Sequence, residues 1–149
     1  MSLHEPLEID PERVALTQLV EVLTPLRQHR QASAERACKR LEQTLHELRE
    51  QLLTSQASLS QERDNQKTRR QQLATAHLQQ TVALNDIDRW HEKERRMLDR
   101  LAQIRQHISH LQARIETLRE QLQQALLEVK ARQRAVEKLA CLSESLNEE

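Results

Sequence analysis

The stretch "MLDRLAQIRQHISHLQARIETL", Met97 to Leu118, carries the pattern that decides the fold. Apolar residues recur in it at alternating steps of four and three, which is the heptad repeat of a coiled coil. The same register continues in both directions along the chain. Its a positions are Ile87, Glu94, Leu101, Ile108, Ile115, Leu122, Val129 and Val136, and its d positions are Trp90, Met97, Ile104, Leu111, Leu118, Ala125, Arg132 and Leu139. Only Glu94 and Arg132 are polar, so the sequence predicts a long helix that buries one seam against a partner helix.

The composition is typical of long helices and favours one extended domain over a compact globule. The chain has no glycine, three prolines and one aromatic residue, Trp90. Without aromatic side chains it lacks the bulk for a thick core, and without glycine it has little turn chemistry. The 23 basic and 23 acidic residues give a net charge of +0, which is unlike the basic excess of nucleic-acid binders. We therefore expect an all-α protein with one extended domain and no nucleic-acid partner.

The first half of the chain carries a second seam at the same spacing. Its members are Ala34, Cys38, Leu41, Leu45, Leu48, Leu52, Ser55 and Leu59. The run that follows, Ser60 to Gln72, contains no apolar residue. Two halves of similar length predict a long antiparallel two-helix coiled-coil hairpin over residues 25–149. We expect its turn near residues 84–87, where Asn85 and Asp86 favour a turn and a helix start. A turn at Ser60–Asn65 is the alternative.

Residues 1–24 are expected to form an N-terminal segment with a short amphipathic helix. Asp10 can cap this helix and Pro11 suits its first position. One apolar face is marked by Leu16, Leu19, Leu23 and Leu26. Pro25 removes a backbone hydrogen bond and predicts a kink or break near Thr24. The four-three spacing also slips between Leu26 and Ala34, so we expect this segment to fold back or to dock on a partner.

The expected turn also predicts the state of the two cysteines. It places Cys141 opposite about Arg30, roughly 12 Å along the axis from Cys38 at ~1.5 Å per residue. A disulfide requires Cα atoms about 5.5–6 Å apart. The sequence therefore predicts two free thiols, each packed as a small apolar residue.

One part of the seam suggests a partner surface. The expected register places the polar run at residues 60–72 opposite about residues 99–111, so Leu101, Ile104, Ile108 and Leu111 would be incompletely covered. An incompletely covered apolar stripe next to Met97 suggests a binding surface for a partner. The alternative is that the basic side chains of the polar run cover the stripe with their stems. Trp90, at the expected hairpin tip, either closes the end of the seam or docks a partner.

No catalytic or metal-binding pattern is present in the sequence. The absence of glycine excludes a glycine-rich phosphate loop. His107 and His110 share a helix face but lack further metal ligands nearby. We therefore expect a non-enzyme without metal or cofactor. The N-terminus lacks the apolar region of a signal peptide and no run reaches transmembrane length, so we expect a cytoplasmic protein with no direct membrane insertion.

Two segments resemble a known family. "DIDRWHEKERRML", Asp86 to Leu98, opens the second helix with acidic and apolar residues around Trp90, and "EVKARQRAVEKLACL" runs from Glu128 to Leu142. Together with the two-helix periodicity over most of residues 28–146, they resemble the type III secretion stalk proteins. These are the YscO/HrpO group of injectisomes and their flagellar counterpart FliJ. The segment before Pro25 departs from the flagellar pattern, in which the long helix starts near the N-terminus.

The resemblance implies a non-enzymatic stalk in the central pore of a hexameric secretion ATPase. Such a stalk links the ATPase to the export gate protein at the inner-membrane base of the secretion apparatus, and some members bind secretion chaperones. For this chain it implies export-gate binding by Met97, Leu101, Ile104 and Ile108 after Trp90 at the hairpin tip, and ATPase-pore contact by Arg27, Arg30, Arg132 and Arg134.

Other classes of protein remain as alternatives. A coiled-coil chaperone or adaptor would clasp helical partners and bind no ATPase. A nucleic-acid-binding arm is disfavoured by the neutral charge, because such binding depends on phosphate contacts. A homodimeric four-helix bundle would cover the apolar stripe by self-association.

Overall fold

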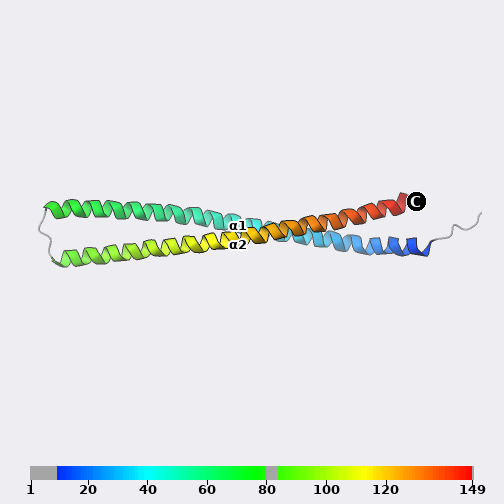
Figure 1. Ribbon diagram of the computed structural model, residues 1–149, viewed down its shortest axis with the longest axis horizontal. Helices are drawn as coiled ribbons and strands as arrows, with labels where there is room; N and C mark the ends of the chain where they lie inside the picture. The colour runs from blue at the N-terminus through cyan, green and yellow to red at the C-terminus, as the bar shows by residue number, and fades with distance from the viewer. Residues whose placement is uncertain (1–9, 80–83, 149) are drawn as a thin grey trace, which may run out of the picture. The chain divides into compact units, whose positions relative to one another are not determined.

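The computed structural model describes residues 10–79 and 84–148, except for the side chains of residues 77–79. It consists of two helices, α1 (Pro11–Gln79) and α2 (Leu84–Glu148) (Figure 1). The helices pack against each other as an antiparallel hairpin, and the described ranges contain no strand, which confirms the all-α fold. In these ranges neither helix has a stretch that is long and apolar enough to span a membrane.

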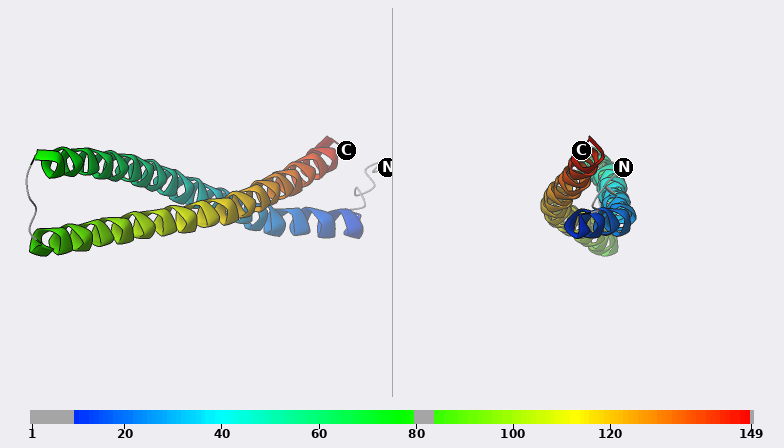
Figure 2. Two further views of the ribbon diagram at one scale, coloured as in Figure 1. Left: turned by 60° about the vertical axis from the view of Figure 1, so that its left-hand side comes forward. Right: turned by 90° about the vertical axis from the view of Figure 1, so that its right-hand side faces the viewer.

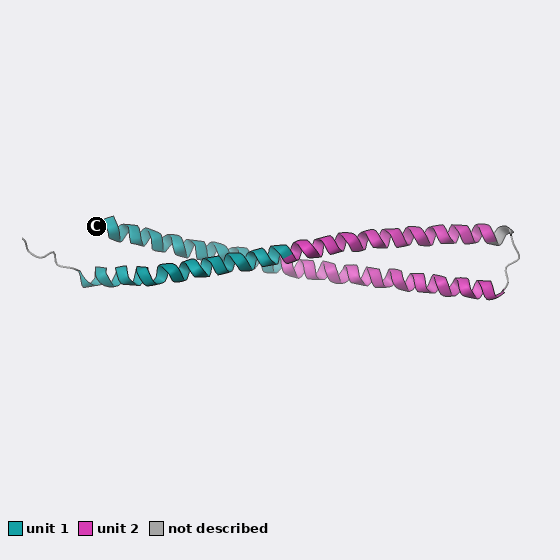
Figure 3. Ribbon diagram, turned by 180° about the vertical axis from the view of Figure 1, so that it is seen from behind, with its two compact units in different colours: residues 1–43, 120–149 teal, residues 44–119 magenta. Residues whose placement is uncertain are grey.

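The chain divides into two compact units (Figure 3). Unit 1 comprises residues 1–43 and 120–149, and unit 2 comprises residues 44–119. Within each unit, a segment of α1 runs alongside an antiparallel segment of α2, as Figure 2 also shows. Each unit therefore buries its own part of the seam.

The start of α1 follows from local capping chemistry. The Glu12 N–H donates to Oδ1 of Asp10 at 3.0 Å, and the Val14 N–H donates to the Asp10 carbonyl oxygen at 3.1 Å. These bonds satisfy backbone donors that the first turn of a helix leaves without partners. Pro11 occupies the first helical position, where its missing N–H costs nothing. The predicted cap at Asp10 is confirmed.

The heptad repeat of the second half is confirmed position by position. Every a and d residue from Ile87 to Leu139 is buried or half-buried, including the polar Glu94 and Arg132. The most buried apolar side chains of unit 1 are Val20, Cys38 and Leu139, and those of unit 2 are Leu45, Leu48, Leu101, Ile108, Leu111 and Ile115. The hairpin is therefore held by a seam that is one side chain deep on each helix.

The expected short N-terminal helix is wrong, because α1 runs without a break through Pro25. An internal proline costs about 3 kcal/mol in a helix, so tertiary contacts must offset it. Val20 is only 7% exposed, and Nη1 of Arg27 donates to the Ala135 carbonyl of α2 at 2.9 Å. The Thr24 hydroxyl, next to the proline, donates to the Val20 carbonyl at 2.7 Å. Contacts with α2 on both sides of Pro25 hold the helix together.

The turn expected near residues 84–87 is also displaced. These residues form the first turn of α2, and the connection falls in residues 80–83, outside the described residues. The alternative turn at Ser60–Asn65 is wrong because those residues lie inside α1. Acidic Asp86 suits a first helical turn as well as a loop, since carboxylates favour helix N-termini. Asn85 and Asp86 alone therefore could not distinguish a turn at residues 84–87 from the start of a helix there.

The displaced turn changes the register between the helices. In unit 2, Arg70 contacts Glu94 and Glu62 contacts Arg100. The facing residue on α2 lies 7 positions from the expected one for Arg70 and 9 positions from it for Glu62, or roughly 10–14 Å at ~1.5 Å per residue. The polar run at residues 60–72 consequently faces a stretch of α2 that is nearer to Trp90 than expected.

Both cysteines are free thiols, as predicted. Cys38 is buried, and its burial together with the nearby carboxylate of Glu42 raises the pKa of the thiol above its ordinary value. Cys141 is exposed, so its predicted packing as an apolar residue is wrong. The reason is its heptad position, because Cys141 lies two residues beyond the buried d residue Leu139 and points away from the seam.

Candidate partner-binding surfaces

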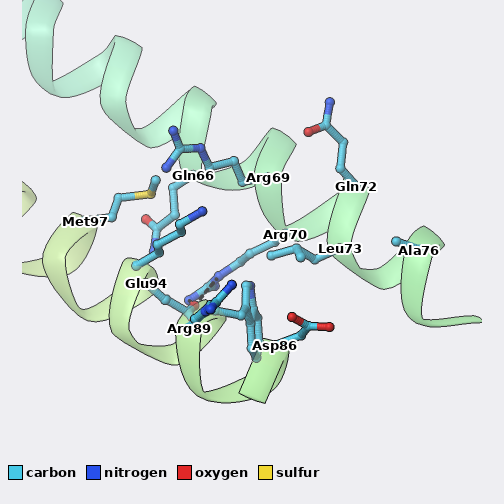
Figure 4. Close-up of a pocket in the computed structure, with 12 residues that line it drawn as sticks. Gln66, Arg69, Arg70, Gln72, Leu73, Ala76, Asp86, Arg89, Glu94 and Met97 are labelled. Carbon is cyan, nitrogen blue, oxygen red and sulfur yellow. Dashed lines mark hydrogen bonds and ion pairs between the residues drawn. The ribbon is translucent and has the colours of Figure 1, made fainter. Parts of the chain in front are cut away.

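A groove of about 730 Å³ lies in unit 2, near the ends of the two helices at the hairpin tip. Its lining from α1 is Gln66, Arg69, Arg70, Gln72, Leu73 and Ala76, and its lining from α2 is Asp86, Arg89, Trp90, Lys93, Glu94 and Met97. We call it the tip groove. Figure 4 shows Leu73 pointing from α1 toward α2 and Arg70 reaching across to Glu94.

The tip groove exists because the seam becomes polar at this level. Gln66 is half-buried at a position where the heptad spacing would place an apolar residue, and Glu94 occupies an a position of α2. Such side chains do not interdigitate as leucines do, so the seam is not filled. Half-buried Trp90 and Met97 line the resulting space.

An ion pair joins the two helices across the tip groove. Nη2 and Nε of Arg70 both donate to Oε1 of Glu94, at 2.7 and 2.9 Å. The Glu94 side chain is 20% exposed and that of Arg70 is 59% exposed. A pair this accessible contributes about 0–1 kcal/mol to stability, but it satisfies the one acidic group in this part of the α2 seam. The pair therefore explains how Glu94 is accommodated at a seam position.

The tip groove carries more positive than negative charge. Arg69, Arg70, Arg89 and Lys93 line it, against the carboxylates of Asp86 and Glu94. Glu94 is already paired with Arg70, while Arg69, Arg89 and Lys93 form no ion pair within the residues that the structure describes. Next to these cations, the Trp90 ring lies 4.8 Å from the His91 ring. An apolar side chain accompanied by a carboxylate suits this combination.

The four residues expected to bind the export gate differ in accessibility. Leu101 and Ile108 are 3% and 9% exposed, so both belong to the core of unit 2. The register shift explains this for Ile108, because the apolar seam around Leu52 and Leu59 faces it instead of the polar run. Ile104 and Met97 are half-buried, and only Met97 lines the tip groove. The expected open stripe is therefore mostly covered in this structure.

The four arginines expected to contact the ATPase lie in one stretch of unit 1, but they are not equivalent. Arg27 is half-buried and donates to the Ala135 carbonyl, as described above. Arg132 is half-buried at its d position, and its Nε donates to Oε1 of Glu128 at 2.7 Å. Arg30 and Arg134 are exposed. Arg27 therefore links the two helices and Arg132 is bonded within α2, whereas Arg30 and Arg134 are accessible to another molecule.

The tip groove was not predicted from the sequence, although two signals for it were present. The basic residues ending in Arg69 and Arg70 suggested only side chains whose stems cover the apolar stripe of the second helix. The single acidic a residue, Glu94, suggested only an interruption of the seam. Opposite charges at two seam interruptions would have indicated that these segments face each other, which is the register that the Arg70–Glu94 pair establishes.

The chain was matched against models of known protein families. A family model described as "Type III secretion protein YscO" matches residues 20–149. No curated protein and no solved structure matches the chain. The matched region contains nearly all of the described hairpin, including the tip groove and the four arginines of unit 1.

Proposed function

Because the chain belongs to the YscO family of type III secretion proteins, we propose that it is a non-enzymatic stalk of an injectisome. It binds the hexameric secretion ATPase through unit 1 and the export gate protein through the tip groove. The family match over residues 20–149 is the observation that carries this proposal. The two accessible surfaces, an arginine pair in one unit and an aromatic groove in the other, support a protein with two different partners.

The ATPase contact is assigned to exposed arginines of unit 1. Arg30 and Arg134 have accessible side chains, and a guanidinium group binds carboxylates in a bidentate manner. The two arginines suit acidic loops at the inner face of the hexameric ATPase ring. Arg27 acts indirectly, because its bond to Ala135 maintains the helix pair that presents the other two, whereas the bond of Arg132 to Glu128 orders its side chain along α2.

The export-gate contact is assigned to the tip groove. Trp90 and Met97 offer apolar surface, and Lys93 offers a cation beside it. Tryptophan is enriched among residues that dominate binding energy at interfaces. Leu101 and Ile108 are buried in the seam, do not line the tip groove and do not touch the partner themselves.

The proposed location follows from these partners. A stalk that bridges an ATPase and an export gate works in the cytoplasm, at the inner-membrane base of the secretion apparatus, where it contributes to virulence. Secretion chaperones are further partners in this proposal, because their helical surfaces would fit an exposed coiled coil.

The ATPase assignment is tested by adding the purified chain to the secretion ATPase of the same organism. ATP turnover and hexamer formation are measured together. We expect the chain to increase both, and Arg134→Glu to reduce the increase. Arg114→Glu is the matched control, because Arg114 is an exposed arginine of α2 in unit 2. No change in turnover or assembly with the unaltered chain would contradict the ATPase contact.

The gate assignment is tested separately with the cytoplasmic part of the export gate protein. Calorimetric titration should give binding that Trp90→Ala and Lys93→Glu weaken and that Arg114→Glu leaves unchanged. If Trp90→Ala and Lys93→Glu changed the affinity no more than the control Arg114→Glu does, the export gate protein would have to bind elsewhere on the chain. Binding to many amphipathic helices without any effect of the chain on the ATPase would favour the chaperone or adaptor alternative.

A further inference from the structure

A second apolar stripe runs along α1 in unit 1, outside the seam. Leu16, Leu19 and Leu26 are 41%, 52% and 41% exposed, and Leu23 is half-buried. Their spacing of three, four and three residues is that of one face of a coiled coil. These four leucines, with Glu12 before them and Arg30 after them at the same spacing, are called the N-terminal stripe.

The contacts of unit 1 explain why the N-terminal stripe is not covered by α2. Arg13 and Arg27 donate to the carbonyls of Leu146 and Ala135, and Val20 lies between them at 7% exposure. These three residues are seven positions apart and therefore mark the face of α1 that meets α2. Leu19 directly precedes Val20, so it points about 100° away around the helix axis.

The continuity of α1 through Pro25 fixes this rotation. The four-three spacing of the leucines is offset by one residue from the spacing of the seam, which is the slip seen in the sequence between Leu26 and Ala34. A break at Pro25 would have let the first segment rotate its leucines toward α2. Because the helix is continuous, the offset persists and the leucines stay on a face of their own.

We propose that the N-terminal stripe binds the N-terminal stripe of a second copy of this chain, with the two α1 segments antiparallel. In this arrangement Leu16 packs against Leu26 of the second copy and Leu19 against Leu23. Glu12 of each copy lies beside Arg30 of the other. The stripe is self-complementary in both shape and charge, as an interface with two-fold symmetry requires.

The charges at the two ends of the N-terminal stripe favour the antiparallel orientation and a second copy of the chain as the partner. A parallel pair would place two Glu12 carboxylates together at one end and two Arg30 guanidinium groups together at the other, which is unfavourable. Both side chains are exposed, and neither forms an ion pair within the residues that the structure describes. They are therefore available to pair with a second copy.

The size of the stripe indicates a weak dimer. Four leucines over a span of roughly 15 Å of helix cover less than the ~800 Å² per partner of a standard interface. We expect a dimer that dissociates on dilution in the micromolar range. Because the dimer and the proposed ATPase contact both use Arg30, one chain cannot make both contacts through it at once, and the test of the dimer uses the chain alone.

The test is sedimentation equilibrium over a concentration series up to about 500 μM, a range that detects weak micromolar association. We expect reversible dimers that Leu19→Asp weakens by about 10-fold or more, because it places a carboxylate against Leu23 of the second copy. Leu53→Asp is the matched control, since Leu53 is a 66% exposed leucine of α1 outside the stripe. Circular dichroism checks that each variant keeps its helices.

Charge reversal tests the orientation. Glu12→Arg and Arg30→Glu should each weaken the dimer by a few-fold at low salt, and the double change should restore it, because opposite charges again face each other. A wild-type chain that stays monomeric throughout the series would overturn the proposal. A dimer that Leu19→Asp leaves intact would show that the N-terminal stripe is not the interface. A dimer that neither Glu12→Arg nor Arg30→Glu weakens would contradict the antiparallel orientation.

Discussion

Replacing Leu101 tests whether the residues expected to bind the gate belong to the core of unit 2. Leu101 is 3% exposed, whereas Leu98 on the same helix is 48% exposed. Truncating a buried leucine to alanine costs about 2–5 kcal/mol, through lost burial and the cavity that remains. The seam is one side chain deep and its cavities open to water, so the lower end, about 2–3 kcal/mol, is expected for Leu101→Ala. Leu98→Ala should cost less than about 1 kcal/mol because half of its side chain is already hydrated.

The assay is urea unfolding followed by circular dichroism at the helical band. With a urea dependence of about 2 kcal/mol per molar, Leu101→Ala should lower the unfolding midpoint by roughly 1 M. Leu98→Ala should lower it by less than half as much. If the two variants unfolded at the same midpoint, the burial of Leu101 in the seam would be refuted. If Leu101→Ala kept full stability but lost gate binding, Leu101 would be a contact residue after all.

Four further predictions concern the continuity of α1, the tip and the two thiols. Pro25→Ala should stabilise the protein by up to ~3 kcal/mol in the same urea assay, because α1 is continuous and the change restores a helical hydrogen bond; no gain would indicate a break at this position. A double-mutant cycle on Arg70 and Glu94 should give a coupling of about 0.5–1 kcal/mol that falls with added salt, and a coupling of zero at low salt would exclude the pair. A maleimide reagent should modify exposed Cys141 quickly and buried Cys38 slowly under native conditions, as peptide mass analysis would show. The pKa of Cys38 is raised in the folded chain, so the unfolded chain loses the thiol proton at a lower pH. The free energy of unfolding should therefore fall as the pH rises above the ordinary thiol pKa. Cys38→Ala should remove that part of the pH dependence, and a pH profile that the substitution leaves unchanged would contradict the raised pKa.

The helical fold and the start of α1 both followed from local sequence patterns alone. Sixteen successive a and d positions between Ile87 and Leu139 predicted which face of α2 is covered, and each of them is covered. The cap at Asp10 was equally local, because it depends on one side chain and the next few backbone N–H groups. Periodicity is written in the chain itself, so no knowledge of the partner helix was needed.

The two candidate surfaces depended on information that no single segment contains. The sequence showed four leucines before Pro25 and a polar run before Gln72, but the facing residues of each were set by the register. Asn85 and Asp86 suit a turn and a helix start equally well, and a few residues of ambiguity there move every facing pair along the hairpin. The tip groove and the burial of Ile108 both follow from that shift.

What the sequence determined by itself is the helical seam, because a repeat of apolar residues specifies a buried stripe in any helix that carries it. It also determined the leucine spacing of the N-terminal stripe and the two free thiols. What only the tertiary structure decided is which residues face each other and whether α1 continues through Pro25. Contacts with α2 by Val20 and Arg27 offset the local cost of the proline. The tendency of Pro25 to break the helix, worth a few kcal/mol, is overcome because packing on both sides of the proline supplies a comparable energy. The leucines of the N-terminal stripe are rotated away from α2 as a result.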